Sequence, residues 1–173
     1  MRILLTMCAV AALAACDQNQ SKVSVAATGA AATAAAKPSA APLAKNKALA
    51  LMKARHEKYE EIGDAMKAAG RELKASSPNL AVVRKSADTI AAFAPTVPGL
   101  FPAGTGPDVG RTEAKAEIWQ KPEDFRAKAA DFNRAARAFQ AAARGGNLDA
   151  IRAAQGGLGK SCKACHDLYR EDH

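Results

Sequence analysis

The stretch Cys162-Lys163-Ala164-Cys165-His166 forms a C-x-x-C-H motif close to the end of the chain. On a helix, the two cysteines lie about one turn apart, and His166 follows Cys162 by four residues on nearly the same face. Two thiols at this spacing can each form a thioether with one vinyl group of a haem. The imidazole then lies beside the iron, for which histidine is a common ligand. The motif predicts covalent haem c, attached through Cys162 and Cys165 with His166 as axial iron ligand.

Two other kinds of site also use a C-x-x-C. A thioredoxin-like dithiol expects a βαβ context, and no segment of this sequence has a strand pattern. A zinc site needs about four ligands, and outside the motif the only other histidines are His56 and His173. Both alternatives stay open at this point, although the motif favours haem c.

Apolar residues recur at helical spacing in four segments of the chain. The pattern predicts helices over about 45–75, 78–93, 122–145 and 147–169. Ser77 is the expected N-cap of the second helix, with Pro78 at its first position. Residues 94–111 are rich in proline and glycine, which predicts a long irregular connection without helix. The fold class predicted is all-α, an antiparallel four-helix bundle with the haem near the C-terminal helix.

The N-terminal residues predict export. Residues 1–15 combine Arg2 with a short apolar run, as in a signal peptide. That run is too short to span a bilayer, which needs about 20 residues. Its end, Leu13-Ala14-Ala15-Cys16, resembles a bacterial lipobox, which makes Cys16 the expected site of lipidation. An ordinary signal peptide, cleaved nearby, is the alternative.

Three domains follow from this organisation. Residues 1–15 are the expected signal peptide, and residues 16–44 are a flexible, alanine-rich and proline-containing tether behind the lipidated cysteine. Residues 45–173 form the helical bundle. We therefore expect a protein of the bacterial periplasm, anchored to the inner or the outer membrane.

Charge and side-chain chemistry exclude several functions. The net charge is +8, but basic residues alternate with acidic ones and form no block with aromatic residues, so we expect no nucleic-acid partner. The sequence shows no Ser-His-Asp set, carboxylate pair or phosphate-binding glycine loop. We therefore expect a protein that is not an enzyme.

Over about residues 45–173, the chain resembles the class II cytochromes c and is most similar to the cytochromes c′. The resemblance is carried by residues in three places: Arg55, Tyr59 and Ile62-Gly63, then Glu117-Ile118-Trp119, and finally Cys162-Lys163-Ala164-Cys165-His166-Asp167-Leu168-Tyr169-Arg170.

The resemblance implies one covalent haem c with five-coordinate, high-spin iron. It implies that Arg55 lies near a haem propionate, that Tyr59 faces the open side of the iron in a distal pocket, and that Arg170 lies beside the proximal side. It also implies binding of nitric oxide or carbon monoxide, a homodimer formed through the first two helices, and a periplasmic location. The lipobox and the tether depart from the usual form of the family and put free diffusion as an electron carrier in doubt.

Tyr59 is also where the sequence departs from the low-spin relatives of the same fold. Those relatives have a methionine at the matching position, whereas a neutral phenol is a poor iron ligand. Met52 and Met66 each lie seven residues away, about 10 Å along a helix, and His56 is a further candidate for a sixth ligand. A six-coordinate, low-spin electron-transfer cytochrome is therefore the alternative function. A non-haem metal-binding lipoprotein is a more distant one.

We expect Cys16→Ser to prevent cleavage at the lipobox and to abolish labelling by a lipid precursor. A single short acyl chain binds membranes only marginally, so stable anchoring requires more than one chain. The measurement is metabolic lipid labelling together with fractionation of membranes. Wild-type protein that enters the soluble fraction without detergent would contradict the anchor.

Overall fold

The computed structural model describes residues 43–171. The expected signal peptide, Cys16, most of the tether and His173 lie outside these residues. The helices, in chain order, are α1 (Lys45–Lys74), α2 (Leu80–Phe93), η1 (Ala94–Leu100, a 3-10 helix), α3 (Glu117–Gln120), α4 (Pro122–Gly145) and α5 (Leu148–Tyr169). In this part of the chain, no helix has both the length and the apolar composition needed to cross a membrane.

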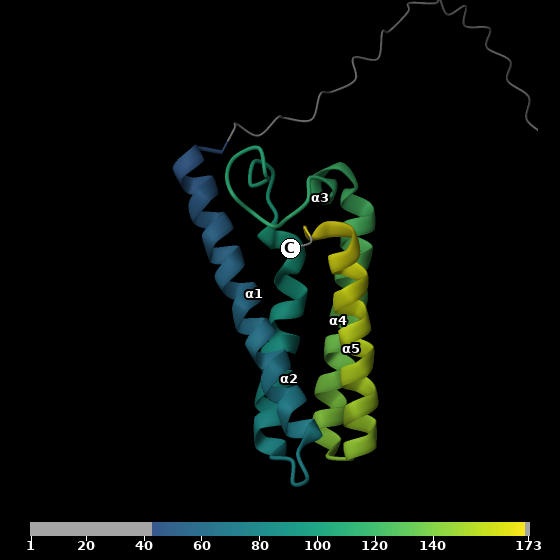
Figure 1. Ribbon diagram of the computed structural model, residues 1–173. Helices are drawn as coiled ribbons and strands as arrows, with labels where there is room; N and C mark the ends of the chain where they lie inside the picture. Colours follow the sequence, from purple (N-terminus) through teal and green to yellow (C-terminus); the bar gives the residue numbers. More distant parts are fainter. Residues whose placement is uncertain (1–42, 172–173) are drawn as a thin grey trace, which may run out of the picture. The chain divides into compact units, whose positions relative to one another are not determined.

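Four long helices form the bundle. Short turns join α1 to α2 and α4 to α5 at one end, and the long connection between α2 and α4 lies at the other end (Figure 1). Helix α4 packs mainly against α5 and α2, and α1 packs mainly against α2, whereas α1 and α5 touch at few points. The prediction of an all-α, antiparallel four-helix bundle is confirmed.

The core follows the heptad of phenylalanines on α4. Phe125, Phe132 and Phe139 are 5%, 8% and 0% exposed, because residues seven apart lie on the same face of a helix. Ile90 of α2 and Ile151 of α5 are fully buried against this face. Burial of each such side chain contributes about 1.5–3 kcal/mol to folding, so this face of α4 is a large part of the core that α2 and α5 share with it.

The start of α2 differs from the prediction. The N-cap is Asn79, whose side-chain oxygen accepts hydrogen bonds from the backbone N–H groups of Ala81 at 3.0 Å and Val82 at 3.4 Å. The prediction of Ser77 as cap and Pro78 as first helical residue was wrong. An asparagine two or three residues before free N–H groups satisfies them as well as a serine does, and the sequence alone did not distinguish the two.

The connection between α2 and α4 also differs in part. Residues 94–100 form the 3-10 helix η1, with Pro95 near its start and Pro98 inside it. Proline fixes φ near the value that a 3-10 turn needs, and the short helix tolerates the missing donors. The expectation that no residue of 94–111 is helical was therefore wrong for this part.

The short helix α3 fixes the only tryptophan of the chain. The indole Nε1 of Trp119 donates hydrogen bonds to the carbonyl oxygens of Phe101 and Pro102, each at 3.1 Å. The two hydrogen bonds of the half-buried indole tie α3 to the loop that follows η1.

Two neighbouring glycines at the end of α4 provide a test of helix termination. Gly146 has φ = 78°, the left-handed conformation, whereas Gly145 is the last residue of the helix. We expect Gly146→Ala to lower the free energy of unfolding by about 1–2 kcal/mol, because an L-residue is strained at that φ. A β-carbon at this position would lie 3.5 Å from Arg84 Nη2, an ordinary contact, so the loss arises from the backbone.

Gly145→Ala is the control, because a β-carbon there meets no atom within 4 Å. We expect no loss of stability and a gain of at most about 1 kcal/mol. Chemical denaturation of the two variants measures both values. Equal effects of the two substitutions would contradict the assignment of Gly146 as the helix terminator.

Candidate haem site

The C-x-x-C-H motif lies on the last turns of α5. Cys162 and Cys165 are both half-buried free thiols that pack against the core. Burial raises the pKa of both, that of Cys165 to about 11. His166 is exposed, and its pKa lies below the ordinary value, first because of desolvation and then because of the positive charge of Arg170. The neutral imidazole that results is the form that binds a metal ion.

Tyr59 of α1 is half-buried on the face that turns towards the core. Its ring packs in T-shaped contacts against two phenylalanines. The distance between ring centroids is 5.2 Å to Phe93 and 6.2 Å to Phe101. The pKa of the phenol is raised, first by burial and then by the nearby thiols of Cys165 and Cys162. The structure packs Tyr59 and both cysteines against the same buried cluster, although more than 100 residues separate them along the chain.

Arg55 lies one turn before Tyr59, and its side chain is buried, with 4% exposed. Its Nη1 donates to the carbonyl oxygen of Leu100 at 3.3 Å and to Thr105 Oγ1 at 3.1 Å. Its Nη2 donates to the carbonyl oxygen of Thr105 and to Thr112 Oγ1, both at 3.1 Å. The guanidinium also lies over the ring of Phe101, 4.6 Å from its centroid.

The acceptors around Arg55 are all neutral. A buried guanidinium is costly unless an anion offsets its charge, and desolvation accordingly lowers the pKa of Arg55. Among the described residues no carboxylate is paired with it, and its Nε hydrogen is the donor that still lacks an acceptor there. A buried cation without an acidic partner fits a bound group that carries its own carboxylates, as haem does through its propionates.

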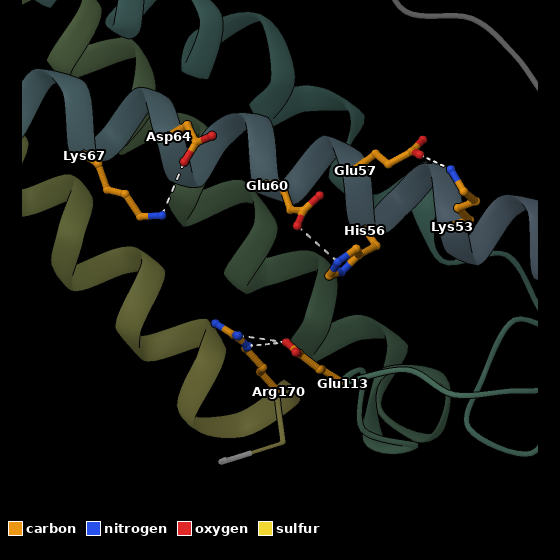
Figure 2. A network of polar contacts seen from close by, with 8 residues as sticks. All are labelled: Lys53, His56, Glu57, Glu60, Asp64, Lys67, Glu113 and Arg170. Atoms are coloured by element: carbon orange, nitrogen blue, oxygen red, sulfur yellow. Dashed lines mark hydrogen bonds and ion pairs between the residues drawn. The ribbon is translucent and has the colours of Figure 1, made fainter.

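Arg170 follows the end of α5 and faces the long connection. Its Nε donates to Glu113 Oε2 at 2.8 Å, and its Nη2 lies 2.8 Å from the same oxygen (Figure 2). The two backbones are also hydrogen-bonded to each other. Lys115 N donates to the carbonyl oxygen of Tyr169 at 2.9 Å, and Glu171 N donates to the carbonyl oxygen of Glu113 at 2.8 Å. The connection is thus joined to the end of the helix that carries the motif.

A second contact fixes the same end of α5. Tyr169 is 4% exposed, and its hydroxyl donates to the carboxylate of Asp124 in the first turn of α4. Burial and this hydrogen bond raise the pKa of Tyr169 to about 12. The last turn of α5, with Cys165 and His166, therefore has its position set by α4 as well as by the connection.

The other candidates for iron ligation lie elsewhere on α1. Met52 is buried with its Sδ-methyl group close to Gly110, and Met66 lines a surface groove with Gly70 and Arg71. His56 is exposed beside Glu60, with Nε2 3.4 Å from its carboxylate (Figure 2). In residues 43–171, no three side chains of His, Cys, Asp or Glu are grouped to hold a metal ion.

Sequence reasoning did not find the residues that hold these side chains. Thr105 and Thr112 bind Arg55, Glu113 binds Arg170, and Asp124 binds Tyr169. Each partner lies 45 or more residues from the residue it binds, and no local pattern marks it. Phe101 had one usable signal: a large aromatic residue within a segment rich in proline and glycine must pack against something.

A four-helix bundle with a C-x-x-C-H on its last helix, and with a buried arginine on its first helix whose acceptors in the described residues are all neutral, defines a class of c-type cytochrome. The comparisons agree. The family model described as cytochrome c′ matches residues 50–170, and the cytochrome c′ of Pararhodospirillum photometricum is 38% identical over 117 residues, which are 68% of this chain and 93% of that protein. The chain belongs to the cytochrome c′ family and carries covalently attached haem c.

Solved structures of the family have the same fold. One, described as a cytochrome c′ with an unusual ligand-controlled dimer dissociation, has a TM-score of 0.68 and 30% identity, and the match covers 76% of this chain and all of that one. Another, a nitric oxide complex of a mutant of cytochrome c prime from Alcaligenes xylosoxidans, has a TM-score of 0.66 and 28% identity over 73% of this chain and 97% of that one.

We expect Cys162→Ala and Cys165→Ala each to leave one thioether, and the double variant to lose covalent haem. The reason is that the two half-buried thiols on α5 are the attachment atoms. Extraction with acid–acetone, followed by mass spectrometry of the chain, measures the attachment. Cys16→Ser is the matched control and should keep its haem. Haem that stays with the double variant through extraction would contradict the assignment.

Proposed function

We propose that this protein binds nitric oxide or carbon monoxide at a five-coordinate haem iron. The observation that carries the proposal is the packing of Tyr59, which lies on the inner face of α1 against the same buried cluster as Cys162 and Cys165 of α5. A side chain in this place is suited to face the side of the haem opposite His166. The relative from Alcaligenes xylosoxidans was solved as a nitric oxide complex, which supports the same ligand here.

When bound, the haem supplies an iron that accepts one diatomic ligand or one electron. His166 would hold the iron from α5. Arg55 offers the donor that remains on its guanidinium to a propionate, and Arg170 lies beside the proximal side, held by Glu113. Because burial raises the pKa of Tyr59 above its ordinary value, the phenol stays neutral near pH 7 and shields the iron without ligating it.

The alternative is a six-coordinate, low-spin electron-transfer cytochrome. It requires that the protein supply a strong sixth ligand to the iron. The surroundings of the three candidates on α1 do not favour this role. Met52 packs against the connection, Met66 lines a groove, and the side chain of His56 is 63% exposed. An optical spectrum of the reduced protein distinguishes the two: broad high-spin bands support gas binding, and sharp low-spin bands support the alternative.

The homodimer is a proposal for this chain as well. Leu49 and Leu51 on α1 are 41% and 37% exposed, which provides apolar surface on one of the two helices that the family uses. The relative with ligand-controlled dimer dissociation supports a dimer that responds to ligand. The proposal also includes a location in the periplasm and a membrane anchor through Cys16. Both rest on the signal-peptide and lipobox patterns of residues 1–16.

We expect Tyr59→Ala to bind imidazole about tenfold faster, with a smaller gain for nitric oxide. The ring excludes large ligands more than small ones, and its displacement disturbs packing worth more than the hydrogen bond of about 1 kcal/mol that it offers a bound ligand. Tyr59→Met should shift the reduced iron towards low spin. Stopped-flow kinetics and optical spectra measure the two effects.

Met66→Leu is the control on the same helix, about two turns from Tyr59, and should leave spectrum and kinetics unchanged. An unchanged spectrum in Tyr59→Met, together with unchanged imidazole kinetics in Tyr59→Ala, would show that Tyr59 lies away from the iron. Met52, Met66 and His56 would then again be candidates for the sixth ligand.

A further inference from the structure

The guanidinium of Arg55 is almost fully used by the connection between α2 and α4. Arginine has five N–H donors, and the four on Nη1 and Nη2 are directed at residues 100, 105 and 112. Thr105 is fully buried, and its hydroxyl donates in turn to the carbonyl oxygen of Pro102 at 2.8 Å. Arg55 and its acceptors therefore form a clamp that fixes loop 100–112 against α1.

The residue that this clamp positions is Phe101. Its ring lies below the Arg55 guanidinium and contacts the edges of Phe125 at 5.0 Å and Trp119 at 6.1 Å between centroids. Its carbonyl oxygen accepts a hydrogen bond from the Trp119 indole. The backbone of Phe101 is thus held from α3 while its ring is covered from α1, so the ring has little freedom to move.

Phe101 also forms one side of the packing around Tyr59. Two rings touch the phenol, Phe93 from the end of α2 and Phe101 from the loop. Phe93 is 7% exposed inside the core, where movement is costly. A ligand that displaces the Tyr59 ring must therefore push aside Phe101 and the loop that carries it. The clamp determines how far this loop can move.

We propose that Phe101 is a specificity-determining residue and Thr105 a positioning residue, which together admit diatomic ligands to the iron and exclude larger ones. The inference rests on the proposed function, because it needs Tyr59 to face the iron. Arg55 then has two tasks: it offers a donor to the haem, and it fixes the loop that supports Tyr59.

The first test compares Phe101→Leu with Phe132→Leu. Both substitutions remove a ring from the same aromatic cluster. The ring of Phe132 contacts that of Phe93, with 6.4 Å between centroids, whereas the ring of Phe101 contacts Tyr59 itself. We expect Phe101→Leu to bind imidazole about tenfold faster, and nitric oxide less than about threefold faster, than wild type. Phe132→Leu should leave the ratio of the two rates unchanged.

The second test loosens the clamp and leaves the aromatic cluster intact. Thr105→Val removes one of the two acceptors of Arg55 Nη1 and leaves the carbonyl oxygen of Leu100, and Thr96→Val is the matched control. The Thr96 hydroxyl makes the same local bond, to the carbonyl oxygen three residues earlier at 2.7 Å, and makes no contact with Arg55. We expect a several-fold rise in the ratio of imidazole to nitric oxide association rates for Thr105→Val only. Optical spectra confirm that haem is bound in all four variants.

The outcomes separate this inference from the proposed function. Wild-type protein that binds nitric oxide with high-spin iron, while Phe101→Leu and Thr105→Val keep the wild-type ratio of rates, would refute the inference and keep the function. Equal rises of the ratio in Thr105→Val and Thr96→Val would also refute it. Low-spin wild-type protein without nitric oxide binding would refute the proposed function itself.

Discussion

The structure depends on one buried cation. Arg55 places a guanidinium inside the bundle without a carboxylate beside it in the described residues, and hydrogen bonds to neutral groups offset only part of the desolvation cost. Two features follow from this. The loop after η1 must supply carbonyl and hydroxyl oxygens, which determines its path, and a buried guanidinium without an acidic partner fits a group with its own carboxylates, such as the haem c of this family.

The two ends of the bundle are stabilised in different ways. At the end with the short turns, arginine side chains donate to carbonyl oxygens near helix C-termini: Arg84 Nε binds Ala143 at 3.1 Å and Arg152 Nε binds Leu73 at 3.2 Å. These contacts satisfy acceptors that a helix end leaves free. At the other end, α1 and α5 have few direct contacts, and the long connection holds them through Arg55 and Arg170. The end that is held by a loop is also the end that carries the haem site.

This arrangement explains why local patterns predicted the helices better than their supports. The heptad of phenylalanines on α4, the glycine at its end and the Asn147 cap of α5 are short-range features, and they lie within or beside the segments predicted as helices. The start of α2 was assigned to the wrong residue because serine, proline and asparagine in succession all favour a helix start. The helical turns of η1 were missed because proline content alone does not distinguish a 3-10 helix from an irregular loop.

The sequence by itself predicted the chemistry of the site: a C-x-x-C-H has a fixed spacing on one helix, so the motif favoured haem attachment over a dithiol or a zinc site before the fold was known. It also determined that four amphipathic helices must bury their apolar faces together. Only the tertiary structure decided which residues surround the site. Thr105 binds Arg55 across 50 residues, and Phe101 reaches Tyr59 across a loop. Such contacts depend on how the helices pack and on where a long connection returns, and the sequence has no local periodicity that encodes either.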